Sequence, residues 1–232
     1  MREPDELVNR ILLFLGRFDL FSGLSESSLM AITGSSKFVL FKKGQFIFLQ
    51  DDLCEKAYLV RTGCVSILLE SLDGRKLVIN EMRVGDFFGE VGLLTSHPRS
   101  SSAIARTDSE ILVIPRDVFL EVINREPTLV RRLLELAANR LRESSERESA
   151  LAFLDAQGRL ARLLLQLGER ELEKGYITIS QEELAERTGQ TRQTVAKALG
   201  RWRRAGWLIT GRGRIMLLNH DALSHQEAGV SA

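Results

Sequence analysis

A glycine-rich stretch between residues 85 and 107 combines closely spaced glycines with acidic residues and arginines. It reads Gly85-Asp-Phe-Phe-Gly89-Glu90 and, after eight further residues, Arg99-Ser100. A guanidinium pairs with a phosphate, a carboxylate accepts from a ribose hydroxyl, and backbone amides or a hydroxyl bind the other phosphate oxygens. We therefore predict a ligand site made by Gly89, Glu90, Arg99 and Ser100. Glycines that only mark turns, with an ordinary Arg-Glu ion pair, are the alternative interpretation.

Residues 180–206 have the pattern of a helix-turn-helix. Ser180 followed by Glu183 forms a capping box that starts one helix, and Gly189 permits the left-handed turn that ends it. Thr191 then caps a second helix, whose apolar positions share one face: Val195, Ala198, Leu199 and Trp202. The remaining faces are polar and basic, which suits entry into the major groove of DNA.

Positive charge is concentrated in this part of the chain, although the formal net charge of all 232 residues is only +1. Eight basic residues occur between residues 187 and 214 with no acidic residue among them: Arg187, Arg192, Lys197, Arg201, Arg203, Arg204, Arg212 and Arg214. Such a local excess attracts a polyanion. Residues 207–218 follow the second helix with the pattern of a β-hairpin wing, whose tip is basic.

The second helix and the wing carry the side chains that we predict to contact double-stranded DNA: Thr191, Arg192, Gln193, Thr194, Lys197, Arg201 and Arg212. Arginine pairs with guanine, glutamine pairs with adenine, and basic side chains at the rim neutralise phosphates. A basic helical hairpin that binds another protein is the alternative interpretation.

The segments before this unit predict a β domain with short helices at its start. Residues 5–33 place apolar side chains at helical spacing, with Ser25 as a helix cap. From residue 37 to residue 115, short runs of Val, Ile, Phe and Leu alternate with glycines, and Asp73-Gly74 predicts a tight hairpin. Short strands with no helical pattern between them favour a sandwich or barrel over a parallel sheet.

From Pro127 to about Leu154 the chain has no glycine and no further proline, and it predicts one long helix. Residues that recur at three- and four-residue steps form a seam along it: Leu129, Leu133, Leu136, Ala137, Arg140, Leu141, Ser144, Glu148 and Leu151. A long core helix is one interpretation. Because two small domains cannot cover a helix of this length, we favour a coiled coil with a second copy, and hence a homodimer. A further helix is expected from Gly158 to Leu172, then a strand at 176–179.

Composition argues against several classes of protein. The chain is 44% hydrophobic and 27% charged, which is globular composition. Charged residues among the first fourteen argue against a signal peptide, and no apolar run reaches membrane-spanning length, so we expect a cytoplasmic protein with no membrane partner. Cys54 and Cys64 are too few for a disulfide framework, and no cluster offers four metal ligands. Without a P-loop or a Ser/His/Asp set we expect no enzyme, and an enzyme of nucleotide metabolism is the weaker alternative.

Over nearly its full length the chain resembles the cyclic AMP receptor protein and fumarate-nitrate regulator superfamily of transcription factors. Residues 85–100 resemble the phosphate-binding cassette of this family, residues 180–206 its helix-turn-helix, and residues 151–159 the hinge after its dimer helix. The resemblance implies an α+β fold with a jelly-roll-like β-roll that binds a cyclic nucleotide, a long dimerisation helix and a C-terminal winged helix-turn-helix.

The implied boundaries are 1–126 for the sensor domain, 127–155 for the dimerisation helix and hinge, 156–220 for the DNA-binding domain and 221–232 for a flexible tail. The implied partners are a pseudo-palindromic DNA operator, a second copy of the chain and, as a further candidate, RNA polymerase. Ligand binding is then expected to change how the long helices pair and so to set the spacing of the two recognition helices.

The resemblance also implies a ligand. Arg140, Ser144 and Ser145 stand where the cyclic AMP branch places an arginine and two hydroxyl residues that face the nucleotide, so they join the predicted ligand site. A polar stretch on an exposed helix flank is the alternative for the two serines. Cyclic AMP is the first candidate effector and cyclic GMP the second. A regulator of the same fold that is active without ligand, or that answers to another effector, is the alternative function.

Other branches of the family fit less well. No cysteine precedes Cys54, so we expect no iron-sulfur cluster, and His97 is a lone histidine in the β domain, so we expect no haem. Within the recognition helix, Gln193 replaces a glutamate and Lys197 replaces an arginine of the cyclic AMP branch. The half-site sequence is therefore left open, although glutamine favours adenine.

Overall fold

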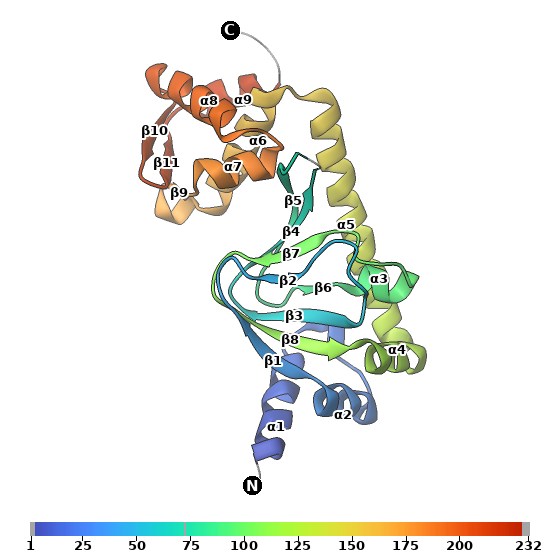
Figure 1. Cartoon of the computed structure of the whole chain (residues 1–232). Helices are drawn as coiled ribbons and strands as arrows, with labels where there is room; N and C mark the ends of the chain where they lie inside the picture. Colours follow the sequence, from blue (N-terminus) through green and yellow to red (C-terminus); the bar gives the residue numbers. More distant parts are fainter. Residues whose placement is uncertain (1–2, 72, 229–232) are drawn as a thin grey trace. The chain divides into compact units, whose positions relative to one another are not determined.

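The computed structural model of the chain describes residues 3–71 and 73–228 (Figure 1). It divides into two units: the first unit comprises residues 1–69 and 79–141, and the second unit comprises residues 70–78 and 142–232. The division therefore falls inside the long helix, whereas the sequence suggested a boundary in front of it.

Two four-stranded antiparallel sheets form the β domain of the first unit, as a sandwich predicts. One sheet has the order β1-β8-β3-β6 and the other has the order β2-β7-β4-β5. The strands are β1 (Lys37–Phe41), β2 (Phe46–Phe48), β3 (Lys56–Thr62), β4 (Val65–Glu70), β5 (Lys76–Met82), β6 (Phe87–Phe88), β7 (Ser102–Ala105) and β8 (Ser109–Pro115). The expected hairpin at Asp73-Gly74 is present, with Gly74 in the left-handed region.

Strand β8 lies between two hydrophobic cores. Ile111 and Val113 face the core between the sheets, whereas Leu112 and Ile114 face the core beneath the helices. Successive side chains of a strand point to opposite faces, so a strand covered on both faces becomes an unbroken apolar run. This explains the sequence from residue 111 to residue 114, which shows no polar alternation.

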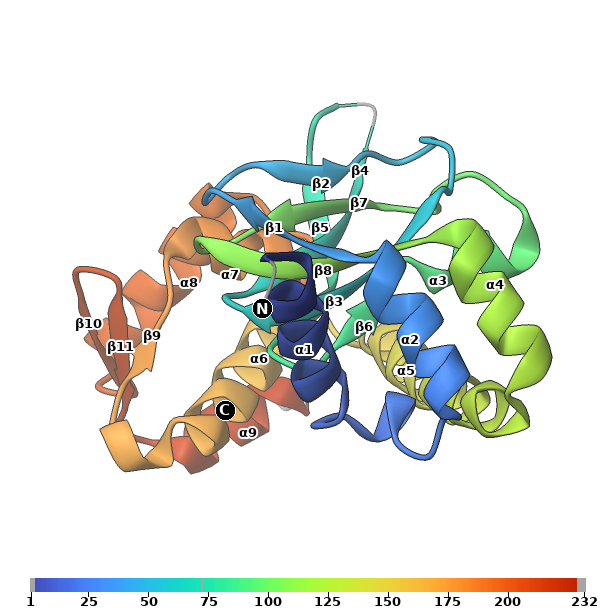
Figure 2. The same cartoon turned by 90° about the horizontal axis from the view of Figure 1, so that it is seen from below.

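Helices cover the outer face of the sheet that contains β8. They are α1 (Glu3–Leu15), the 3-10 turn η1 (Asp19–Phe21), α2 (Glu26–Ser35) and α4 (Arg116–Arg125), and Figure 2 shows α1, α2 and α4 on this side of the sheet. Ser25 caps α2 as predicted, accepting from the backbone amide of Ser28. Glu126 accepts hydrogen bonds from Ser25, and the hydroxyls of Ser25 and then Ser28 hold the pKa of Glu126 below its usual range. A short helix inside the β region, α3 (Glu90–Thr95), was not predicted.

The long helix α5 (Pro127–Phe153) is present as predicted, but its seam differs from the expected one. Leu129 and Leu133 are buried in the core of their own chain. Leu134 is 65% exposed and Leu141 is 69% exposed. Two residues of the expected seam therefore belong to the core of their own chain, whereas Leu141 and Leu151 of the same seam are exposed. No helix in the described part of the chain is both long and apolar enough to cross a membrane.

The second unit contains the predicted helix-turn-helix and wing. Its elements are α6 (Ala156–Arg170), the 3-10 turn η2 (Leu172–Lys174), β9 (Ile177–Thr178), α7 (Gln181–Thr188), α8 (Arg192–Arg204), β10 (Leu208–Gly211) and β11 (Arg214–Leu217). Asp155, whose side chain accepts from the amide of Gly158, starts α6 two residues earlier than predicted. Ser180 and Thr191 cap their helices, and Gly189 adopts the left-handed conformation, all as predicted. Strands β10, β11 and β9 form one sheet.

The expectation of a flexible tail from residue 221 is wrong for most of this segment. Residues His220–Glu227 form a ninth helix, α9, whose first turn is capped by Asn219. Leu223 is fully buried in the core of the second unit, with Leu160 and Trp202 among the residues of that core. The segment consists mostly of small and polar residues, so the sequence did not indicate that Leu223 would anchor it. Residues 229–232 lie outside the described part.

Leu223→Ala should destabilise the second unit by about 2–5 kcal/mol, because it leaves a cavity at a fully buried site. Both tryptophans of the chain, Trp202 and Trp207, lie in this unit, so their fluorescence during urea unfolding reports on it. Ser224→Ala, on the exposed side of the same helix, is the control and should change little. Equal stability of the two variants would show that the segment frays as the sequence suggested.

Candidate ligand site and nucleic-acid interface

Gly89 and Glu90 begin helix α3, and the backbone at Gly89 fixes where the carboxylate lies. Gly89 has φ 80°, a conformation that glycine adopts without strain. A Cβ added to it would lie 2.7 Å from Nη1 of Arg99, so no larger residue fits beside this guanidinium. Glu90 follows as the first helical residue and is only 5% exposed. The predicted neighbours Gly89, Glu90 and Arg99 are therefore brought together.

Arg99 is buried, at 4% exposed, although it lies in the segment that connects α3 to β7. Its Nη1 donates to the carbonyl of Gly89 and its Nη2 to the carbonyl of Lys56, each at 2.6 Å. The guanidinium carbon lies 4.2 Å from the ring centre of Phe48 and 5.4 Å from that of Tyr58. These two rings hold the guanidinium plane by cation-π contact.

Hydrogen-bonding capacity is left over in this cluster. A guanidinium has five N–H donors, and Arg99 uses two of them on backbone carbonyls. Its buried Nε and the buried Oε2 of Glu90 have no hydrogen-bond partner among the described residues. A buried donor and a buried acceptor that lack protein partners are costly unless a ligand or water binds them. The pair suits a molecule that has an anionic oxygen and a hydroxyl.

The second oxygen of Glu90 is bound by the long helix. Nη1 of Arg140 lies 2.5 Å from Oε1 of Glu90, and Nη2 of Arg140 donates to the carbonyl of Phe87. The predicted Arg140 thus joins the cluster from helix α5, within the same unit. Arg99 makes no ion pair with any described residue. Two guanidinium groups and one carboxylate leave one positive charge in excess, which favours a singly charged anion.

The three predicted serines are placed differently. Ser100 follows Arg99 but its side chain is exposed. Ser144 and Ser145 lie after Leu141, in the second unit, so their relation to the cluster stays a prediction. The Ser144 hydroxyl donates to Glu148 one turn further along the helix. No residue was predicted to support Arg99, and the structure adds Phe48, Tyr58 and the carbonyl of Lys56. Burial raises the pKa of the Tyr58 phenol. Aromatic strand residues look like ordinary core residues in a sequence, so no signal distinguished these two.

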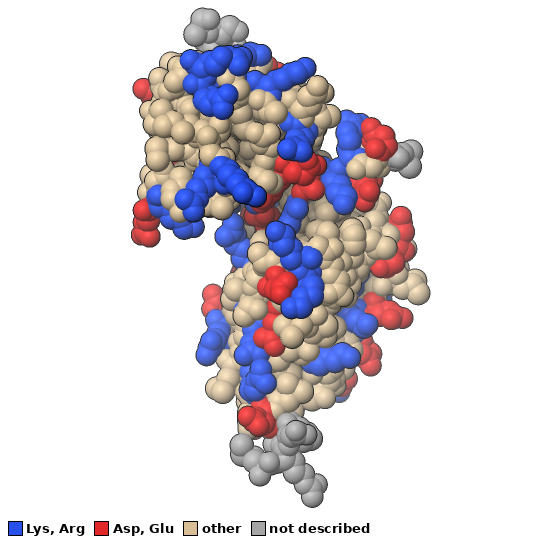
Figure 3. Space-filling model, turned by 60° about the vertical axis from the view of Figure 1, so that its left-hand side comes forward, with Lys and Arg blue, Asp and Glu red and all other residues tan. Residues whose placement is uncertain are grey.

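Helix α8 presents its polar face to solvent, as predicted. Its apolar face is buried through Val195, Ala198, Leu199 and Trp202. Of the residues predicted to contact DNA, Thr194 is half-buried and the others are exposed: Thr191, Arg192, Gln193, Lys197, Arg201 and Arg212. Arg201 donates to Gln157 of α6. The space-filling view shows lysine and arginine side chains over this unit, in the upper part of Figure 3.

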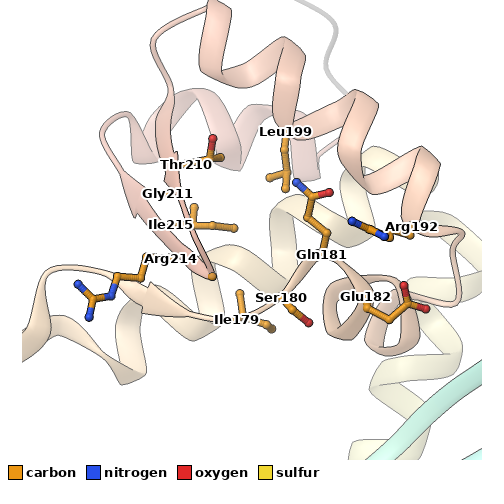
Figure 4. Close-up of a pocket in the computed structure, with 11 residues that line it drawn as sticks. Ile179, Ser180, Gln181, Glu182, Arg192, Leu199, Thr210, Gly211, Arg214 and Ile215 are labelled. Atoms are coloured by element: carbon orange, nitrogen blue, oxygen red, sulfur yellow. The ribbon is translucent and has the colours of Figure 1, made fainter.

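A groove of about 420 Å³ lies between the start of α7, helix α8 and the wing. Gln181 and Arg192 point into it, whereas Arg214 points away from it (Figure 4). The Arg214 guanidinium lies 4.6 Å from the ring centre of Tyr176, which positions it beside the wing. Arg214 belongs to the basic run seen in the sequence, but neither it nor Gln181 was predicted as a contact. No group of His, Cys, Asp and Glu side chains in the described part of the chain could hold a metal ion.

Comparison with known families matches both units. The cyclic nucleotide-binding domain matches residues 38–126, and the Crp-like helix-turn-helix domain matches residues 158–226. The first match contains Glu90 and Arg99, and the second ends within helix α9.

Whole-chain relatives agree with these matches. The chain is 30% identical over 91% of its length to a CRP-like cAMP-activated global transcriptional regulator of Mycobacterium tuberculosis, of which it covers 97%. It is 33% identical over 84% of its length to a cyclic AMP receptor protein of Thermus thermophilus, of which it covers 90%. Among solved structures, the c-di-GMP responsive global regulator CLP of Xanthomonas campestris has a TM-score of 0.73 at 25% identity, over 83% of this chain and 99% of that one.

Arg140→Met should lower the stability of the first unit by about 2–4 kcal/mol, because it leaves the buried carboxylate of Glu90 unpaired. The value is below that of a fully buried pair since the Arg140 side chain is 23% exposed. Adding Glu90→Gln should recover most of the loss. Calorimetry measures the stability of the two single variants and of the double variant. Tryptophan fluorescence is the internal control, because both tryptophans lie in the second unit. Additive effects of the two substitutions would contradict a direct pair.

Proposed function

The chain belongs to the cyclic AMP receptor protein and fumarate-nitrate regulator family of DNA-binding transcription regulators, and we propose that a cyclic nucleotide, cyclic AMP first, switches its affinity for DNA. The observation that carries the proposal is the cluster of Glu90, Arg99 and Arg140, in which one buried acceptor and one buried donor have no partner in the described part of the chain. Cyclic GMP is the second candidate ligand. The regulator acts in the cytoplasm and is not an enzyme, in line with relatives that are named as transcriptional regulators.

The residues fit the ligand atom by atom. Oε2 of Glu90 accepts from the free ribose 2′-hydroxyl, and the unused N–H groups of Arg99 donate to the cyclic phosphate, with Ser100 at the same loop. The single phosphate charge balances the one excess positive charge of the cluster. The assignment of Ser144 and Ser145 to the nucleobase rests on the family resemblance alone.

Ligand binding is coupled to the long helix through Arg140. This side chain joins Glu90 and Phe87 of the β domain to helix α5, so a ligand that draws on the Glu90 carboxylate also alters what holds the helix. A ligand shifts a conformational equilibrium by as much as its affinities for the two states differ. The two states here differ in how α5 lies against the cassette.

Helix α5 pairs with a second copy of the chain. Its outer stripe reads Val130, Leu134, Ala137, Leu141, Ser144, Glu148 and Leu151, at alternating steps of four and three residues. Such a repeat is the seam of a coiled coil. Val130, Leu134, Leu141 and Leu151 are exposed in the single chain, and burying them in a homodimer removes this apolar surface from water. The inner residues Leu129 and Leu133 serve their own core instead.

The dimer reads a roughly two-fold symmetric operator with two recognition helices in successive major grooves. Arg192 and Gln193 begin α8 and are exposed, which is where side chains reach base edges. Lys197 and Arg201 follow on the exposed face, and Arg212 occupies the tip between β10 and β11. RNA polymerase is a further candidate partner of the DNA-bound dimer.

One of the similar structures supports a second candidate function, in which another effector controls the regulator. The Xanthomonas structure is that of a c-di-GMP responsive regulator, and it shares the fold of this chain. The Mycobacterium relative is named as cAMP-activated. The same fold therefore occurs with different effectors, and a panel of cyclic nucleotides distinguishes them. A regulator that is active without ligand would bind its operator equally in every arm of that panel.

The central test is a titration of an operator duplex, selected from a random pool, with and without cyclic AMP, cyclic GMP and c-di-GMP. We expect cyclic AMP to raise operator affinity, with two chains per duplex. Arg99→Met keeps the packing on Phe48 and Tyr58 but removes the charge, and should weaken nucleotide binding about 10- to 100-fold. Arg125→Met, an exposed position paired with Glu121, is the matched control. Unchanged calorimetric nucleotide affinity in Arg99→Met would disprove the ligand site.

Two further variants separate sequence reading from backbone contact. Arg192→Ala should cost about 1–3 kcal/mol per half-site and relax the preference at one base pair. Arg212→Ala should weaken binding to all duplexes alike and lower the salt dependence by about one per subunit. Salt titrations of the selected operator and a scrambled duplex measure both effects. Equal weakening of the two duplexes by Arg192→Ala would mean that α8 holds the backbone and reads no base.

A further inference from the structure

Only Leu154 and Asp155 separate the long helix α5 from helix α6, and both residues accept hydrogen bonds from the start of α6. Helix α5 ends at Phe153, and α6 begins at Ala156 after the cap residue Asp155. All of these residues lie in the second unit, together with α7 and α8. The contacts below therefore belong to one compact unit.

Arg159 bridges the end of α5 to the end of α7. Its Nη1 donates to the carbonyl of Leu154 at 2.8 Å, and its Nε donates to the carbonyl of Thr188 at 3.2 Å. Thr188 is the last residue of α7, where helix carbonyls lack partners within the helix and carry partial negative charge. A guanidinium suits both acceptors because its donors are fixed in one plane.

Gln190 makes a second bridge beside the first. Its side-chain Nε2 donates to the carbonyl of Ala156 at 2.7 Å, and its backbone amide donates to the carbonyl of Ala185 at 2.9 Å. Gln190 stands between Gly189, which ends α7, and Thr191, which caps the recognition helix. Two side-chain hydrogen bonds therefore connect the turn of the helix-turn-helix to the start of α6. One runs from Arg159 to the carbonyl of Thr188, and the other runs from Gln190 to the carbonyl of Ala156.

We infer that Arg159, assisted by Gln190, is the positioning residue that transmits the orientation of the end of α5 to the recognition helix. The hydrogen bonds that the structure describes for its side chain go to the carbonyls of Leu154 and Thr188, and neither residue is proposed to read DNA. Both of its acceptors are backbone carbonyls, so a rotation of the Leu154 peptide displaces the Thr188–Gln190 turn and with it the start of α8. This inference rests on the proposed function, in which a ligand at the β domain changes DNA affinity.

The first test measures the ligand effect, defined as the ratio of operator affinities with and without cyclic AMP. Arg159→Met keeps the length of the side chain but removes all donors, and should reduce this ratio about tenfold. By reciprocity, the effect of operator DNA on nucleotide affinity should fall by the same factor. Arg162→Met, one turn further along α6, is the matched control, because Arg162 makes only a 3.9 Å ion pair with Glu227. Arg159→Lys, which keeps one donor group, should lie between the wild type and Arg159→Met.

The second test needs no nucleotide. The hydrogen-exchange rates of the backbone amides of residues 150–155 are measured with and without operator DNA. In the wild type, DNA should slow exchange at these amides, and in Arg159→Met this slowing should disappear while that in α8 remains. Gln190→Met should show the same loss in part. Tryptophan fluorescence confirms that each variant is folded, since Trp202 and Trp207 lie in the same unit.

The outcomes are distinct. An equal loss of operator affinity with and without cyclic AMP in Arg159→Met, or DNA-induced slowing at residues 150–155 that persists in this variant, would overturn the inference. A wild type whose operator affinity ignores every cyclic nucleotide would reject the proposed function, while the exchange experiment would still decide the role of Arg159.

Discussion

A buried carboxylate needs a positive partner, and in this protein the partner of Glu90 comes from the long helix. Removing one member of such a pair is more costly than the pair is stabilising, because the remaining charge stays buried and unpaired. Arg140 therefore fixes the part of α5 that passes the cassette, and Gly89, which admits no Cβ beside Arg99, fixes the cassette itself. The position of α5 then depends on the same carboxylate that the ligand is proposed to use. The Glu90 carboxylate therefore takes part both in the proposed ligand site and in the ion pair that holds α5.

The long helix α5 carries apolar residues on two sides: one side packs into the core of its own unit, and the other side is exposed. Leu129 and Leu133 pack into the core of their own unit, whereas Leu134 and Leu141 stand one position further round and remain exposed. When a helix is apolar on two adjoining stripes, the sequence alone does not show which apolar residues belong to which stripe. Steps of three and four residues connect members of both stripes. The structure separates the stripes: the inner one packs against the β domain, and the outer one keeps heptad spacing as far as Leu151.

Local signals in the sequence were sufficient where one residue determines the geometry. Ser25, Ser180 and Thr191 cap the helices that they were expected to cap, and Gly189 ends α7. The nearness of Arg99 to residues 89 and 90 was also predictable, since Arg99 donates to the carbonyl of Gly89 as the spacing suggested. Burial was not predictable. Arg99 lies among serines and a proline in the sequence, which suggests a loop, yet two distant aromatic rings and two carbonyls bury it. Leu223 was missed for the same reason, because a single apolar residue gives no period.

The two units differ in the exposure of the charged residues at their candidate sites. The first unit buries Glu90 and Arg99, where salt screens poorly, so recognition there depends on geometry and hydrogen bonding. The second unit exposes Arg192, Lys197 and Arg212, where screening is strong and binding follows ionic strength. The proposed coupling of the two sites passes through covalent and hydrogen-bonded structure. The continuous helix α5, followed by the backbone carbonyls that accept from Arg159 and Gln190, supplies such a route.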